Sequence, residues 1–141
     1  LWGRRRDREE VLGMPALTLV APILSGREEE WRRFVQEVVE ERLSEYEGLR
    51  RRLGIQNESV WLARAKGGQT AMVVYLEAED PERMASALAA SEEPFDLWFK
   101  ERLIECHGRD PAPRRAAAEL IFAYRDVAHD GHRPKDSGQF F

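Results

Sequence analysis

The sequence predicts an α+β domain of the split βαβ kind (βαββαβ), in which a four-stranded antiparallel sheet carries helices on one face. The first observation is the order of the segments: short apolar runs and longer amphipathic stretches follow one another as strand, helix, strand, strand, helix, strand. The second is a Gly-Gly turn between the two central runs, which is typical of a β-hairpin. Right-handed crossovers then place both helical segments on the same face of one sheet.

The first half of this order is a strand followed by one long helix. The run ALTLVAPIL at residues 16–24 is almost continuously apolar and has the length of a strand. Pro22 places the end of this strand at an edge or a bulge, because proline cannot donate to the ladder. Apolar residues then recur every three or four positions, which predicts an amphipathic helix over residues 26–53 that ends at Gly54.

The second half begins with the hairpin and ends with a strand. Asp80 and Pro81 form an N-cap and first-turn pair, so a helix starts there, and Gly108 is placed to end the helical stretch that follows. The predicted elements are strands at 59–65 and 70–78, helices at about 81–90 and 94–107, and a last strand at 118–125 (AELIFAYR).

One folded domain is expected over residues 15–125, with a charged arm at 1–14 and a polar tail at 126–141. The 141 residues suffice for a single core, and 43% hydrophobic with 34% charged residues is typical of a globular chain. The net charge of −4 argues against a nucleic-acid or anionic-membrane binder, because both need a cationic surface. A single cysteine and no apolar run of membrane-spanning length lead us to expect a cytoplasmic protein.

Both faces of the predicted sheet are apolar. In the strand at 70–78, Met72 and Val74 point to one side, while Val73 and Tyr75 point to the other. The helices cover one face, and the second would leave an apolar patch too large for a typical monomer. We therefore expect a homodimer formed by packing sheet on sheet, with coverage by the terminal arms as the alternative.

Several stretches together resemble a known family. They are PILSG followed by Trp31 and Phe34, then RRRLGI, VWL and VYLEAEDP, and finally PFDLWF before His107 and Gly108. They resemble a family of uncharacterised bacterial proteins that is similar to the dimeric α+β barrel group. The resemblance covers about residues 15–125 and implies a ferredoxin-like fold and a barrel-like dimer, with ligands bound in a cleft between the sheet and the helices of each subunit. It implies no activity for this chain, because the wider group includes cofactor-independent monooxygenases, haem-degrading enzymes, isomerases, cyclases and stress-response proteins.

Three polar residues interrupt apolar rows that would face such a cleft. Arg42 and Tyr46 fall on the core-facing stripe of the long helix, and His107 continues an apolar row of the later helix. His107 is the candidate catalytic residue, since histidine moves protons near neutral pH, while Arg42 could hold an anionic oxygen and Tyr46 could orient it. The structural alternatives are a histidine that interacts with helix-end carbonyls, an arginine that reaches the surface and an amphipathic core tyrosine.

Aromatic residues supply the remaining ligand-binding candidates. Trp61 and Trp98 could stack on an aromatic ligand, although such residues are more often core or interface anchors. Tyr75 could lie at the dimer interface or at the mouth of the pocket.

No cofactor or metal is expected. His129, Asp130 and His132 are spaced like metal ligands, but they lie in the polar tail without a fourth partner. Cys106 next to His107 is interpreted as a buried, inert thiol, because adjacent helix positions face different directions. The sequence has no Gly-rich phosphate loop, HExxH or GxSxG motif, so nucleotide use and hydrolysis by the common triads are unsupported.

Two functions remain open at this point. The first is a homodimer that binds a largely apolar small molecule, with cofactor-independent oxygenase or isomerase-like chemistry as one form of this function. The second is a non-enzymatic interaction module without a ligand pocket. An RNA-recognition domain shares the βαββαβ order and binds RNA bases through aromatic and basic residues of its third strand. Here acidic residues follow that strand, which argues against this class of protein.

Overall fold

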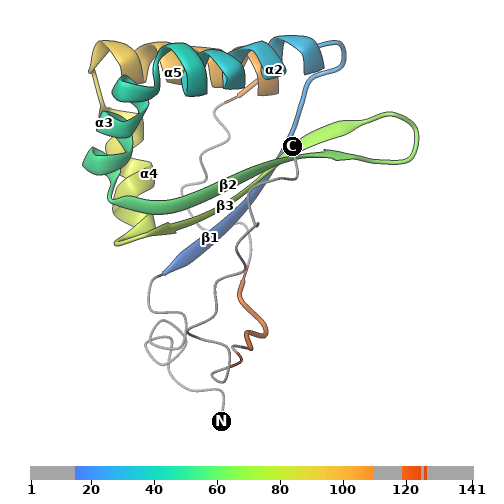
Figure 1. Cartoon of the computed structure of the whole chain (residues 1–141). Coiled ribbons are helices and arrows are strands. Elements are labelled where there is room, and N and C mark those ends of the chain that lie inside the picture. The colour runs from blue at the N-terminus through green and yellow to red at the C-terminus, as the bar shows by residue number, and fades with distance from the viewer. Residues whose placement is uncertain (1–14, 110–118, 125, 127–141) are drawn as a thin grey trace.

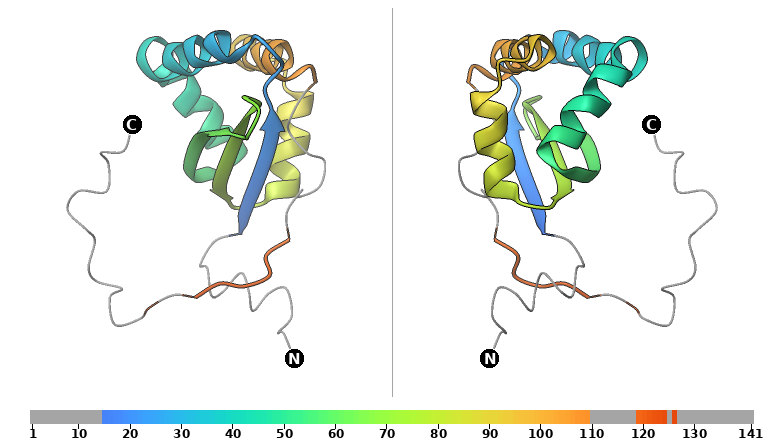
Figure 2. Two further views of the ribbon diagram at one scale, coloured as in Figure 1. Left: turned by 90° about the vertical axis from the view of Figure 1, so that its right-hand side faces the viewer. Right: turned by 90° about the vertical axis from the view of Figure 1, so that its left-hand side faces the viewer.

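The computed structural model describes residues 15–109, 119–124 and 126 and shows an α+β fold. Within these residues, strands β1 (Ala16–Pro22), β2 (Ile55–Arg64) and β3 (Thr70–Ala78) form an antiparallel sheet in the order β1-β3-β2 (Figure 1). Helices lie in front of the sheet in one view of Figure 2 and behind it in the other, so among the described residues they cover one face and leave the opposite face open.

The predicted hairpin is confirmed. β2 and β3 pair directly, and Gly67 and Gly68 in the connecting turn have φ angles of 94° and 86°, in the region that glycine adopts without strain. β3 has the predicted bounds, whereas β2 begins at Ile55, four residues before its predicted start. Pairing on both sides of β3 aligns Val20, Val73 and Trp61 in one row across the sheet.

The predicted continuous helix over residues 26–53 is wrong. It is divided into α2 (Glu28–Gln36), the π-helical turn η1 (Glu37–Glu41) and α3 (Leu43–Leu53). Arg42 leaves the helical conformation at φ −122° and ψ 26°, and the axis bends there. The bend lets α2 run along α5 (Pro94–His107), while α3 turns down beside α4 (Pro81–Ala90) (Figure 1). Tertiary packing thus overrides a local pattern that contains no proline or glycine at this point.

The helix ends that were predicted from local signals are confirmed. Gly54 adopts a left-handed conformation with φ 73°, and its N–H bonds to carbonyls of the last turn of α3. The Asp80 side chain accepts from Arg83 N at 3.1 Å at the start of α4. α5 ends at Gly108, also left-handed with φ 80°.

The core lies between the covered face of the sheet and the helices. Alternate residues of each strand face it, which follows from the two-residue repeat of a strand. Its buried members include Leu17, Ala21, Trp31, Leu49, Leu53, Met72, Val74, Leu76, Ala78, Met84, Leu88, Phe95 and Cys106.

The predicted fourth strand is not found among the described residues. Residues 119–124 have no strand structure, and Ile121, Phe122 and Tyr124 are exposed, Phe122 by 72%. The alternating pattern indicates a preference for extended structure, but a strand also needs a partner edge, which the pattern does not supply. Of the predicted terminal segments, the arm at 1–14 and the tail at 127–141 lie outside the described residues.

Candidate functional site

The residues singled out by the sequence lie at three separate places. Arg42, Tyr46 and Trp98 gather where α2 and α3 face α5. His107 lies at the end of α5 against the end of β1. The other two, Trp61 and Tyr75, belong to the open face of the sheet.

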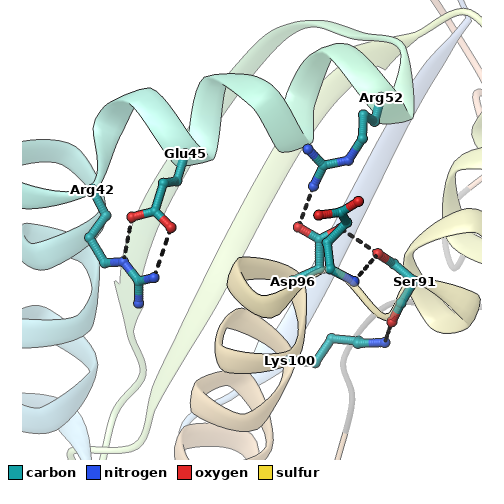
Figure 3. A network of polar contacts seen from close by, with 7 residues as sticks. Arg42, Glu45, Arg52, Ser91, Asp96 and Lys100 are labelled. Carbon is teal, nitrogen blue, oxygen red and sulfur yellow. Dashed lines mark hydrogen bonds and ion pairs between the residues drawn. The ribbon is translucent and has the colours of Figure 1, made fainter.

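Arg42 packs on two aromatic rings of α5. Its guanidinium carbon lies 4.1 Å from the ring centroid of Trp98 and 4.9 Å from that of Phe95, within the range of cation–π attraction. The same guanidinium donates to Glu45 through Nε at 3.0 Å and Nη2 at 2.9 Å (Figure 3). Its charge is therefore paired with Glu45 of α3, while the flat side of its guanidinium packs on the rings.

Tyr46 is committed to a partner on the sheet. Its hydroxyl donates to the Glu58 carboxylate of β2, and its ring lies 5.8 Å from that of Phe99. Burial, and then the charge of Glu58, raise the pKa of the Tyr46 phenol far above its usual range, so the phenol stays protonated.

Aromatic rings from both helical segments fill the region between them. Phe34 contacts Trp98 and Phe99 at centroid distances of 5.6 and 5.4 Å, and Phe95 contacts the same two rings. Such pairs add to the stability of a core beyond what the burial of their apolar surface contributes. A ligand role for Arg42, Tyr46 and Trp98 stays a prediction.

His107 links the end of α5 to the end of β1. Its Nδ1 lies 2.8 Å from the Pro22 carbonyl oxygen, which only accepts, so Nδ1 carries the proton and donates. Nε2 is buried and has no partner within the described part of the chain. Burial lowers the pKa of His107 below 6.5, while the bond to Pro22 opposes this, so the ring is neutral at pH 7.

Cys106 lies beside His107 and is one of the most deeply buried residues. Its carbonyl accepts from Leu24 N at 2.8 Å, which adds a second link between the ends of α5 and β1. Burial raises the pKa of the Cys106 thiol to about 11, which suppresses the reactive thiolate. The side chain therefore acts as a small apolar core group.

The open face is an apolar surface with a polar margin. Trp61 is 51% exposed and Val20 58% exposed at the two ends of the row that crosses Val73. Toward one end of the sheet, the Tyr75 hydroxyl donates to Glu77 at 2.9 Å and Asn57 donates to the same carboxylate at 2.8 Å.

A further site joins residues that the sequence analysis did not single out. A cleft of about 600 Å³ lies where the end of α3 meets the junction of α4 and α5. Arg52 of α3 donates to Asp96 of α5 at 2.6 Å, and Ser91 Oγ donates to the other oxygen of Asp96 at 2.6 Å (Figure 3). Lys100 Nζ of α5 donates to the Ser91 carbonyl at 2.9 Å, which links α5 to the end of α4. The signal in the sequence is Asp96 itself, an acid between apolar neighbours in PFDLWF.

No family model, curated protein or solved structure matches this chain. Within the ranges 15–109 and 119–126 that the structure describes apart from residue 125, no group of three or more histidine, cysteine or acidic side chains is arranged to hold a metal ion. His129, Asp130 and His132 lie outside those ranges. None of the described helices has the length and apolar character needed to cross a membrane.

Proposed function

We propose that the unit of function is a homodimer formed through the open face of the sheet, and that the protein acts as an interaction module. The observation that carries this proposal is the row of Val20, Val73 and Trp61 across the sheet, in which the large apolar side chains at the two ends, Val20 and Trp61, are more than half exposed. Large contiguous apolar patches are typical of surfaces that bind another protein.

The arrangement of this face supports a second copy as the partner. An apolar centre that contains tryptophan and has hydrogen-bonded polar residues at its margin is the usual organisation of a protein interface. Tyr75, Glu77 and Asn57 supply that margin. Two identical faces packed about a twofold axis bury both patches at once, and twofold dimers are the commonest oligomers.

Light scattering after size-exclusion chromatography tests the dimer. We expect a dimer mass for the wild type at micromolar concentration and a monomer mass for Trp61→Ser. Leu97→Ser on α5 is the matched control, because Leu97 is equally exposed at 49% but lies on the helical side, and this variant should stay dimeric. A monomeric wild type, or a dimer that resists Trp61→Ser, contradicts the proposal.

We further propose that residues 119–124 pair with the edge of β1 opposite β3 and complete a four-stranded, ferredoxin-like sheet. The contacts of His107 with Pro22 and of Cys106 with Leu24 bring the end of α5 to the end of β1. A strand that starts there and returns along β1 is antiparallel to it. Amide hydrogen exchange tests this pairing: protection at 119–124 is expected in the wild type and should be lost in Phe122→Pro, which removes a ladder donor.

Binding of a small molecule is the second candidate function, and the cleft between α3, α4 and α5 favours it. Its volume of about 600 Å³ lies within the range of about 300–1,000 Å³ that is common for ligand sites. Titration of the protein with a mixed fragment set, followed by NMR, tests this function. Saturable shifts at Ser91 and Ala87 are expected, and their absence for every fragment contradicts it.

A further inference from the structure

The cleft between α3, α4 and α5 has an unequal distribution of charge and apolar surface. Arg52 contributes one guanidinium, while Glu92 and Glu93 contribute exposed carboxylates from the turn before α5. Apolar side chains complete the lining. They are Leu53, Ala87, Ala90 and Pro94.

Arg52 is held in place by a carboxylate that is itself fixed. Asp96 is 1% exposed, and its two oxygens are separately engaged, one by Arg52 and one by Ser91. A guanidinium has five N–H donors, and Asp96 accepts the one bond that Arg52 makes within the described part of the chain. The side chain of Arg52 is 44% exposed at the cleft, so donors remain for an incoming carboxylate.

The charges around Arg52 select what the cleft accepts. A simple anion that reaches Arg52 meets repulsion from Asp96, Glu92 and Glu93, and a simple cation that reaches the two glutamates leaves the remaining donors of Arg52 unused. A molecule with a carboxylate at one point and an ammonium at another satisfies both. The apolar lining takes an aliphatic group.

We infer that the cleft between α3, α4 and α5 binds a small aliphatic zwitterion, with its carboxylate on Arg52, its ammonium on Glu92 and Glu93, and its alkyl group against Leu53 and Ala87. This inference rests on the second candidate function above and gives it a ligand class. The Arg52–Asp96–Ser91 chain positions the guanidinium for that carboxylate (Figure 3).

Three related probes separate the contributions to binding. They are L-leucine, which carries both charges, isoamylamine, which lacks the carboxylate, and isovalerate, which lacks the ammonium. We expect calorimetry to give L-leucine a dissociation constant on the order of 1 mM. Each of the other two should bind about tenfold more weakly, because each loses one charged contact.

Variants then connect the two charges to named residues. Glu92→Gln combined with Glu93→Gln leaves the Arg52–Asp96 pair untouched and should weaken L-leucine binding about tenfold. Arg52→Lys keeps a charge beside Asp96 but loses the planar fork, and should weaken L-leucine and isovalerate while leaving isoamylamine unchanged. Arg51→Gln is the control, since Arg51 is the neighbouring exposed arginine outside the cleft lining, and it should bind L-leucine like the wild type.

The outcomes separate failure of the ligand class from failure of the site. If isoamylamine or isovalerate binds at the lining residues as tightly as L-leucine, the cleft is a ligand site but the zwitterion assignment is overturned. If none of the probes or fragments shifts the lining residues in NMR spectra, small-molecule binding at this cleft is overturned as well. Equal weakening by Arg51→Gln and Arg52→Lys overturns the role of Arg52.

Discussion

The two faces of the sheet carry similar side chains but have different environments. On the covered face, Val74 and Leu76 are buried under the helices, whereas on the open face Val20 and Trp61 are half exposed. The alternation along each strand shows which residues share a face. It does not show which face the helices cover, because that depends on chain segments far away in the sequence.

The largest expected effect tests the covered face. Leu76→Ala should lower the free energy of unfolding by about 2–5 kcal/mol, because it removes a buried side chain and leaves a cavity. Val73→Ala, on the open face of the same strand, should lower it by less than about 1.5 kcal/mol under conditions where the protein is monomeric. Urea denaturation measures both, and equal losses would show that the faces do not differ as described.

The next effect concerns the polar contacts on the helical side. Ser91→Ala removes the hydroxyl that donates to buried Asp96 and should lower the free energy of unfolding by about 1.5–3 kcal/mol, since bonds to charged groups are strong. Ser59→Ala on the open face is the control, because Ser59 is exposed there, and it should change stability by less than about 0.5 kcal/mol. A loss of similar size at both serines would contradict a structural role for Ser91.

The third effect concerns association through the open face. Val20→Lys places a charge in the row that includes Trp61 and should weaken the dimer at least about tenfold, or about 1.4 kcal/mol, in sedimentation experiments. Its circular dichroism spectrum should stay that of the wild type, because Val20 is exposed. An unchanged dimer constant would exclude this row from the interface.

The smallest effect is a pH dependence of stability that arises from His107, where the end of α5 contacts the end of β1. The folded protein disfavours the charged form of His107, while the unfolded chain takes up the proton near pH 6.5. The free energy of unfolding should therefore fall as the pH drops below 6.5 and level off below the folded-state pKa. His107→Asn, whose amide can donate to Pro22 but does not titrate, should show a shallower pH dependence in denaturation curves. An identical slope would assign the effect to other groups.

Local signals predicted much of the fold. The Gly-Gly turn, the Asp80 cap and the glycines at helix ends act within a few residues, so the hairpin, α4 and α5 could be placed from the sequence. The π-helical turn and the bend at Arg42 could not, because they arise from packing α2 on α5 and α3 beside α4. The segment at 119–124 shows the same limit, since its pattern indicates a strand but does not identify the strand it would pair with.

The same difference between local patterns and long-range contacts applies to the candidate sites. Periodicity placed Arg42 and Tyr46 against apolar residues, and both do contact aromatic rings of α5, although Arg42 lies at the bend before α3 and not within one continuous helix. It could not reveal the contact between Arg52 and Asp96, which are 44 positions apart in the chain. Only the folded chain brings those two charges together.

The π-helical turn Glu37–Glu41 also affects how this chain aligns with others. Such a turn holds one residue more than the α-helical turn that would link the same points, so it is equivalent to a single inserted residue. A sequence of the same fold with a regular helix here would match this chain only when a one-residue gap is allowed between Gln36 and Arg42. An alignment that forbids this gap would shift every later residue of α3 by one position and pair Tyr46 and Arg52 with the wrong neighbours.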